Sequence, residues 1–374
     1  MSEFGLPTSW TTQTLPAIRR ALLNWFDKSH RPLPWRLNRD PYSIWVSEVM
    51  LQQTTVTAVI AYFDRFLTTF PTVHTLAKAD EQDVLKLWQG LGYYRRARHL
   101  HQAAKRLSAE YPDALPNDPA VWAELPGVGR YILGAVLSQA FDAKLPIVEA
   151  NSLRVLSRWF GSKLDPREGD GKKWVWQAAE KVLPAKRVGD FNQAVMELGA
   201  LICTPVEPKC ALCPVAKWCE ANRLGTQSTI PPKPKPKVIV EVHEVGIVIR
   251  DGDRVLLCRR PNDAKRWANM WEIPRGETHP DEKIESAATR IATELTGITV
   301  SPGPELMTIR HGVTRFAITL VCLGATVDGG SFRSHFYPEA RWVTPAELKD
   351  YPVSSSQRKL ADELAKPKRQ QRMC

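Results

Sequence analysis

The sequence lacks any run of about 18 consecutive apolar residues, the length that a helix needs to cross a bilayer. Its first residues, MSEFGLPTSW, also lack the basic segment followed by an apolar segment that marks a secretory signal. Seven cysteines, an odd number, occur without such a signal, which argues against a disulfide framework. From these absences we expect a cytoplasmic protein whose cysteines serve another purpose.

Acidic residues are outnumbered by basic ones. Lys and Arg total 51 against 40 Asp and Glu, which gives a net charge of +11. Such an excess favours a polyanionic partner such as nucleic acid, although charge alone does not indicate catalysis. With 374 residues, 43% of them hydrophobic, the chain is long enough to form two or more domains with ordinary cores.

The period of the apolar residues changes along the chain. From Leu15 to about Cys203 they recur at helical spacing, and Asp40 followed by Pro41 is typical of a helix start. The stretch GTQSTIPPKPKPK then interrupts the pattern, because alternating prolines hold the backbone extended and lysines keep it solvated. Beyond it the period becomes two, and Asp251-Gly252 predicts the turn of a β-hairpin. The sequence therefore predicts a helical domain, a linker and a mixed α+β domain.

Four of the cysteines lie in one short loop with the spacing C-x6-C-x2-C-x5-C: Cys203, Cys210, Cys213 and Cys219. Prolines between them forbid a continuous helix, so all four thiolates can surround one centre. Four thiolates suit either a [4Fe-4S] cluster or a tetrahedral zinc ion. Zinc sites more often pair two C-x2-C knuckles, and this loop has one, which favours iron–sulfur. The spacing leaves both readings open.

The stretch ELPGVGRYILGAVLS predicts a glycine turn followed by a helix that begins near Arg130. Gly127 and Gly129 let the backbone approach an anion, and the first N–H groups of the helix point toward it, which suits a DNA phosphate. An ordinary helical hairpin with a glycine turn is the alternative.

Several motifs occur in a specific order: DPYSIWVSEVMLQQTT, LWQGLGYYRRARHLHQAA, ELPGVGRYILGAVLS, FNQAVMELGALIC and the cysteine spacing. Together they resemble the adenine DNA glycosylases of the MutY type, in the endonuclease III-like helix-hairpin-helix superfamily. The resemblance covers about Leu15 to Cys219. It implies two helical lobes with DNA in the groove between them, and a [4Fe-4S] cluster on the four cysteines.

The same resemblance implies an activity and a domain plan. We expect a monomeric base-excision enzyme that hydrolyses the N-glycosidic bond of adenine opposite 8-oxoguanine or guanine in double-stranded DNA, and that lies with the nucleoid in a bacterium. The expected parts are a glycosylase domain (1–224, with a six-helix lobe at about 37–145 and an iron–sulfur lobe at about 10–36 plus 146–224), a linker (225–237), a Nudix-like domain (238–365) and a basic tail (366–374).

Removing a purine from its sugar calls for protonation of the leaving base and for negative charge near the developing cation. Glu48 lies among apolar residues of a predicted helix, a setting that raises the pKa of a carboxyl group, so it is the candidate acid. Glu149 precedes a helix headed by Asn151, whose dipole favours the ionised form. Without the resemblance, a solvated helix face and a helix cap would explain the two residues. The family usually has Asp-Gly-Asn where this chain has Glu149-Ala150-Asn151, and the resemblance implies a catalytic role for Asn151 as well.

Further positions take their expected roles from the resemblance. The lyase branch carries Lys where this chain has Tyr131, which predicts base removal without strong strand cleavage. Two residues match positions that wedge into the duplex, Gln53 and Tyr93. Four match positions near the extruded adenine: Arg31, Trp35, Arg36 and Gln193. Gly127, Gly129 and Arg130 would contact the DNA backbone.

The C-terminal stretch WEIPRGETHPDEKIESAATRIATELTGI resembles a Nudix box. Ile291 and Leu295 replace two acidic positions that would bind a divalent cation, so pyrophosphatase activity is not expected. The domain instead resembles the part of MutY-type enzymes that recognises 8-oxoguanine, with Thr314 of HGVTRF at the position of a recognition serine. The alternatives are an endonuclease III-like glycosylase/lyase for damaged pyrimidines and a non-catalytic lesion-binding protein.

Overall fold

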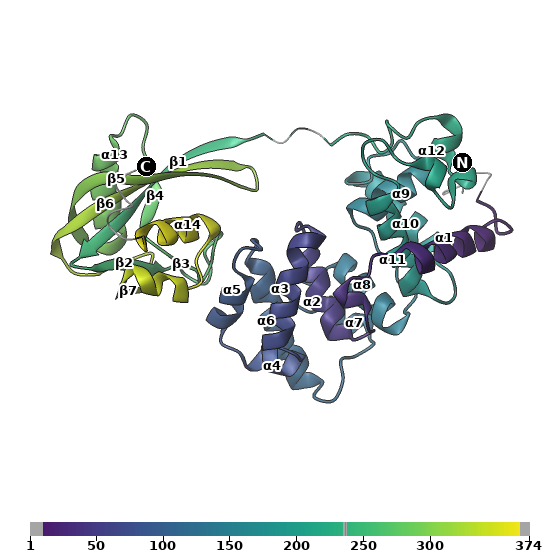
Figure 1. Cartoon of the computed structure of the whole chain (residues 1–374), viewed down its shortest axis with the longest axis horizontal. Helices are drawn as coiled ribbons and strands as arrows, with labels where there is room; N and C mark the ends of the chain where they lie inside the picture. Colours follow the sequence, from purple (N-terminus) through teal and green to yellow (C-terminus); the bar gives the residue numbers. More distant parts are fainter. Residues whose placement is uncertain (1–9, 235, 237, 367–374) are drawn as a thin grey trace. The chain divides into compact units, whose positions relative to one another are not determined.

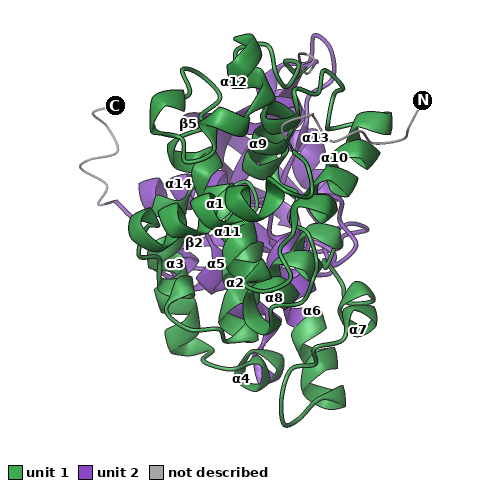
Figure 2. Ribbon diagram, turned by 90° about the vertical axis from the view of Figure 1, so that its right-hand side faces the viewer, with its two compact units in different colours: residues 1–77, 102–235 green, residues 78–101, 236–374 purple. Residues whose placement is uncertain are grey.

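Helices make up the first part of the chain, as the apolar spacing predicted. The computed structural model describes residues 10–234, 236 and 238–366. Residues 1–77 and 102–235 form one compact unit, and residues 78–101 and 236–374 form a second (Figure 2). None of the described helices is long and apolar enough to span a membrane.

The first unit contains α-helices joined by short loops (Figure 1). Its helices are α1 (Leu15–Ser29), η1 (Pro34–Arg36), α2 (Pro41–Leu51), α3 (Val56–Thr69), α4 (Val73–Lys78), the later part of α6 (Arg95–Glu110), α7 (Pro119–Ala123), α8 (Arg130–Phe141), α9 (Ala150–Phe160), α10 (Gly169–Val182), α11 (Val188–Leu201), η2 (Cys210–Leu212), η3 (Ala216–Trp218) and α12 (Glu220–Leu224).

The start of α2 follows the sequence prediction. The Asp40 carboxylate accepts hydrogen bonds from the backbone N–H groups of Tyr42 and Ser43, which otherwise have no partner within the helix. Pro41 occupies the first turn, where its missing N–H costs nothing. Because α2 is fixed at this end, the position of Glu48 two turns later is also fixed.

The core of this unit brings α8, α9 and α11 together. A Cβ atom at Gly199 would lie 2.6 Å from the Cβ of Asn151, and one at Gly189 would lie 2.3 Å from the carbonyl oxygen of Ser138. Real side chains do not tolerate such distances, so α11 approaches the start of α9 and the end of α8 only because both positions are glycine.

The second unit contains a sheet with the helices that cover it, together with residues 78–101 from the earlier part of the chain (Figures 1 and 2). Its elements are α5 (Glu81–Trp88), the first turns of α6, β1 (Val240–Asp251), β2 (Arg254–Arg259), β3 (Trp271–Glu272), β4 (Arg275–Glu277), α13 (Ile284–Thr296), β5 (Ile298–Val313), β6 (Phe316–Gly330), β7 (Glu339–Val343), η4 (Pro345–Asp350) and α14 (Ser355–Leu364).

The sheet is mixed, with strand order β3-β2-β1-β6-β5, and β4 and β7 pair with β1 and β2. Strands β1 and β6 run parallel and the other pairs run antiparallel. Alternate residues of β1 enter two different cores: Ile247 packs on the side of α13, and Val248 packs on the side of α14. A sheet covered on both faces explains the continuous apolar run from Val245 to Ile249 in the middle of β1.

The first hairpin turn differs from the prediction by one residue. Asp251 pairs with Arg254, so Gly252 and Asp253 are the two turn residues, rather than Asp251 and Gly252. Gly252 has a φ of 62°, which favours glycine at that place.

The structure describes the predicted linker and the predicted basic tail only in part. In the linker, residues 235 and 237 lie outside the described residues, as does the basic tail apart from Lys366. The predicted domain limits remain predictions.

Candidate active site

Glu48 lies near the end of α2, where that helix packs on α8. Its side chain is buried, with 3% of the residue exposed. The Tyr131 hydroxyl donates to Glu48 Oε2, and Gln139 Nε2 donates to Oε1 over 2.7 Å. Burial raises the pKa of Glu48, although both hydrogen bonds and the charge of Arg36 act in the opposite direction. The direction agrees with the expectation of an acid that keeps its proton.

Glu149 caps the start of α9 (Ala150–Phe160). Its carboxylate accepts from the backbone N–H groups of Asn151 and Ser152, each over 2.8 Å, and from Asn151 Nδ2 over 3.3 Å. The Ser152 hydroxyl accepts from the Glu149 N–H over 2.8 Å, which completes a reciprocal capping box. Both carboxylate oxygens therefore have fixed positions.

The pKa of Glu149 is raised, whereas the sequence predicted that the helix start would favour the ionised form. Burial raises the pKa of Glu149 and outweighs the two backbone N–H donors, which lower it. The expectation that the helix start alone would lower this pKa was therefore wrong, because burial cannot be read from the helix position. The charge of Glu48 also raises the pKa of Glu149, and both carboxylates raise that of Tyr131 after burial. The three side chains are thus electrostatic neighbours. One proton shared between the carboxyl groups rests best on Glu48, which accepts from two side chains, whereas Glu149 accepts from two backbone N–H groups.

Two of the four residues expected near the adenine, Arg31 and Arg36, meet at the buried carboxylate of Glu197, and Arg36 links a third, Gln193, to this pair. Arg31 Nη2 and Arg36 Nη2 donate to Glu197 Oε2 over 2.8 and 3.0 Å. Arg36 Nε also donates to Gln193 Oε1 over 2.9 Å. Although burial opposes it, this pairing lowers the pKa of Glu197 to about 2. Trp35 is buried and packs edge-on against another ring.

Glu197 was missed in the sequence. It follows Gln193 by four residues in FNQAVMELG, so both lie on the same face of α11. A carboxylate within the apolar stretch from Ala194 to Leu201 was the signal, because a buried carboxylate normally has a cationic partner.

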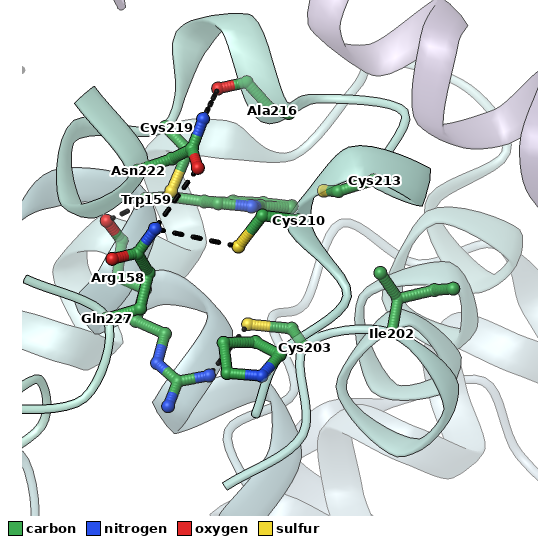
Figure 3. A pocket seen from close by; sticks show the side chains of 11 residues that line it. Arg158, Trp159, Ile202, Cys203, Cys210, Cys213, Ala216, Cys219, Asn222 and Gln227 are labelled. Carbon is green, nitrogen blue, oxygen red and sulfur yellow. Dashed lines mark hydrogen bonds between the residues drawn. The ribbon is translucent and has the colours of Figure 1, made fainter. Parts of the chain in front are cut away.

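The four cysteines line a small pocket in the first unit (Figure 3). Two side chains donate to sulfur atoms: Arg158 Nη1 to Cys203 over 3.4 Å and Gln227 Nε2 to Cys210 over 3.7 Å. A set of four sulfur ligands with donors around it fits an electron-rich metal–sulfur group. Among the described residues, no three His, Cys, Asp or Glu side chains converge on a single metal position.

Known proteins share both parts of this architecture. Residues 46–183 match the family described as HhH-GPD superfamily base excision DNA repair protein, and residues 244–363 match the NUDIX domain family. The adenine DNA glycosylase of Rattus norvegicus is 33% identical, over 92% of this chain and 77% of the relative. That of Schizosaccharomyces pombe is 38% identical, over 73% and 61%. This chain belongs to the adenine DNA glycosylase family.

One solved structure is similar in both fold and sequence. A thermostable thymine-DNA glycosylase matches 57% of this chain and 98% of its own, with a TM-score of 0.51 and 30% identity. These matches confirm the predicted fold class of a helix-hairpin-helix glycosylase domain joined to a mixed Nudix-like domain.

The glycine turn of this family member precedes α8. Gly127 has a φ of 77°, which needs glycine, whereas Gly129 has an ordinary backbone conformation. A Cβ at Gly129 would meet nothing within 4 Å, so the space in front of the helix start is open. The guanidinium of Arg130 lies 4.0 Å above the ring of Trp176, a cation–π contact that holds it beside the turn.

Both residues expected to wedge into DNA have a left-handed backbone, with φ of 59° at Gln53 and 48° at Tyr93. Side chains other than glycine rarely adopt it, and such strain gathers at functional sites. Gln53 is exposed in the first unit, and Tyr93 is 46% exposed in the second. Thr314, with a φ of 55°, is exposed at the turn between β5 and β6.

The segment that resembles a Nudix box has two apolar residues where the resemblance would place acidic ones. Ile291 is 1% exposed and belongs to the core between α13 and the sheet, and Leu295 packs against the same core. A Cβ at Gly276 would lie 3.2 Å from Ile291. Glu282 is paired with Arg290 over 2.7 Å instead. Apolar side chains thus stand at the two positions where the resemblance would place acidic ligands, and the absence of pyrophosphatase activity stays a prediction.

Proposed function

We propose that the protein hydrolyses the N-glycosidic bond of adenine mispaired with 8-oxoguanine, or with guanine, in double-stranded DNA and leaves an abasic site. The observation that carries the proposal is the buried Glu48, hydrogen-bonded to Tyr131 and Gln139 and electrostatically coupled to the capping Glu149. The names of the relatives support adenine as the base.

Glu48 and Glu149 divide the chemistry. Glu48 donates its proton to the leaving base, since burial keeps the carboxyl group neutral. Glu149 supplies negative charge next to the sugar as it becomes cationic, and the N–H groups of Asn151 and Ser152 hold the anion in place. Asn151 Nδ2 adds a third donor, which is the role we assign to Asn151.

The extruded base would be read by the group around Glu197. Arg31 is one-third exposed while its guanidinium is fixed on Glu197, so it keeps donors available at the surface. The Gln193 amide offers both a donor and an acceptor to a base edge. Flipping the target base out of the duplex is the general strategy of enzymes that act on bases.

Strand cleavage is not part of the proposed activity. A lyase needs an amine that forms a Schiff base with the sugar, and the residue in contact with Glu48 is Tyr131. Burial and the neighbouring carboxylates raise the pKa of Tyr131, so its hydroxyl stays protonated and serves as a donor to Glu48.

The cysteine pocket would hold a [4Fe-4S] cluster on Cys203, Cys210, Cys213 and Cys219. The cluster would supply a rigid cross-link between the ends of the loop. Arg158 would help to fix the loop around it, because the Arg158 guanidinium donates to the Cys203 sulfur and to three backbone carbonyl oxygens of the surrounding loops.

The C-terminal domain would recognise 8-oxoguanine with Thr314, whose hydroxyl is exposed at a hairpin tip. The domain limits given above, a monomeric state and a location with the nucleoid in a bacterial cytoplasm complete the proposal. Gln53 and Tyr93 would enter the duplex, and Gly127, Gly129 and Arg130 would contact a phosphate.

A single-turnover assay tests the proposal. Duplexes with adenine opposite 8-oxoguanine, adenine opposite guanine, and an oxidised pyrimidine are incubated with excess enzyme and analysed before and after alkali. We expect base loss from the first two duplexes with strand breaks only after alkali. Direct nicking at the oxidised pyrimidine would instead indicate a lyase, and tight binding without base loss would indicate a lesion-binding protein.

A further inference from the structure

Residues 78–101 lie inside the segment that matches the helix-hairpin-helix family, yet they belong to the same compact unit as the C-terminal domain (Figure 2). Gln82, on α5, makes the most specific contact. Its Nε2 donates to the Asn269 carbonyl oxygen over 3.1 Å, and its Oε1 accepts from Trp271 Nε1 over 2.9 Å. Both ends of the amide are used, so the contact fixes orientation as well as distance.

A second contact lies one residue earlier on α5. Glu81 Oε1 accepts from Asn269 Nδ2 over 2.7 Å and from Arg98 Nε over 3.1 Å. Arg98 in turn donates to the Asn262 carbonyl oxygen over 2.8 Å. The loop of residues 262–269 is thus held by Glu81 and Gln82 of α5 and by Arg98 of α6, and the Glu81–Arg98 ion pair joins the two helices.

The third contact is at the turn between α5 and α6. Gln89 Oε1 accepts from Arg358 Nη2 over 3.0 Å and from the Val353 N–H over 3.5 Å. The Tyr94 hydroxyl donates to the Val353 carbonyl oxygen over 3.4 Å and accepts from the Gly90 N–H over 3.4 Å. Arg358 also donates to carbonyl oxygens that end η4, so its guanidinium is anchored within the C-terminal domain.

The turn between these contacts is conformationally costly. Gly90, Gly92 and Tyr93 all have positive φ, at 104°, 71° and 48°. Tyr93 is not glycine, so its left-handed backbone needs support from its surroundings. The residues on either side of it, Gln89 and Tyr94, are the ones held by the C-terminal domain.

We propose that the C-terminal domain docks on α5 through Gln82 and Gln89, and that Arg358 is a positioning residue that holds the 89–94 turn in the shape that presents Tyr93. The effect on DNA rests on the proposed function, in which Tyr93 enters the duplex. The docking itself does not, because the contacts exist within one unit of the protein without DNA.

Two measurements on the full-length protein test this. The first is amide hydrogen exchange of residues 87–96 in the free protein. Arg358→Ala and Gln82→Ala should speed exchange there, while Lys359→Ala and Asp83→Ala should leave it unchanged. Lys359 and Asp83 are exposed neighbours on the same helices, so these variants control for the loss of a charge or a side chain. Arg358→Lys, which keeps one donor, should restore part of the protection.

The second measurement is the single-turnover excision rate at increasing enzyme concentration, on adenine opposite 8-oxoguanine. For Arg358→Ala the concentration that gives half the limiting rate should rise about fivefold, roughly the loss of one hydrogen bond. The limiting rate should stay within about twofold of the wild type, because an effect on DNA engagement leaves bound-state chemistry intact.

Each outcome decides a separate point. Unchanged exchange in both Arg358→Ala and Gln82→Ala would overturn the docking. Faster exchange with an unchanged half-rate concentration would overturn the positioning role. If the wild-type protein removes no adenine at all, the proposed function fails, while the exchange comparison still decides the docking.

Discussion

Replacing Glu48 with Gln separates the proton of this side chain from its shape. The carbonyl oxygen of the new amide can still accept from Gln139, and its NH2 group can donate to the Tyr131 hydroxyl, which then acts as acceptor. Volume and polar partners are kept, so we expect Glu48→Gln to fold and to bind duplex DNA. Excision should fall by about 10²–10⁴-fold, the usual contribution of a general acid, or roughly 3–5 kcal/mol in the barrier.

The dependence on pH gives this prediction its sharpest form. Because burial raises the pKa of Glu48, the protonated and active form persists above the usual range of a carboxyl group, and the excision rate should fall as pH rises through that pKa. Stability has the same sign. The folded protein holds this proton more tightly than the unfolded chain, so the contribution is full below the unfolded pKa and is lost as pH rises through the folded one. Gln has neither dependence.

The assay is single-turnover excision with saturating enzyme across the acidic to neutral range, together with urea unfolding at the same pH values. Glu180→Gln, a change of the same type at an exposed position on α10, is the control and should match the wild type. If Glu48→Gln excised adenine at the wild-type rate, or kept the wild-type fall with pH, Glu48 would not be the proton donor.

Three other predictions concern the surroundings of this pair. Glu149→Ala removes the cap of α9 and should cost about 1 kcal/mol in urea unfolding, in addition to most of the excision rate, whereas Glu168→Ala should cost less because Glu168 makes no cap bond with α10. Glu197→Gln should lower the free energy of unfolding at neutral pH by about 1–3 kcal/mol, since it removes the charge that pairs with the partly buried Arg31 and Arg36. The folded pKa of Glu197 lies below the unfolded one, so this difference should be present above the unfolded pKa and disappear as pH falls toward about 2; equal acid sensitivity of both proteins would contradict it. Cys213→Ser should reduce the iron content per chain and weaken duplex binding, while full iron incorporation would argue against this ligand.

Local signals placed the catalytic candidates on their elements correctly. Asp40 and Pro41 mark the start of α2, and the counting of residues from there puts Glu48 inside the helix. Glu149 could be placed at the start of α9 because residues that accept from the first N–H groups are a local preference. What could not be predicted is the partnership with Gln139, because it depends on the packing of α2 against α8 and not on any spacing in the sequence.

The burial of individual carboxyl groups could not be predicted from the sequence patterns. The start of a helix lowers the pKa of a carboxyl group, but Glu149 is also partly buried, and desolvation exceeds the helix effect. Glu197 shows the converse: burial raises its pKa, but the hydrogen bonds from Arg31 and Arg36 outweigh burial. These two arginines lie outside α11, so no spacing within that helix predicts them.

In the segment that resembles a Nudix box, the effect of a substitution depends on whether the new side chain is exposed or packed in the core. If Ile291 and Leu295 were exposed, they would only remove two acidic ligands, and two substitutions could restore these ligands. The structure shows that Ile291 fills the core between α13 and the sheet, against Gly276, so a carboxylate placed there would have to be buried without a partner. At Ile291 and Leu295, therefore, α13 presents packing surface and not ligands. We expect the contribution of this domain to the glycosylase at its contacts with α5 and at the exposed hairpin tip of Thr314.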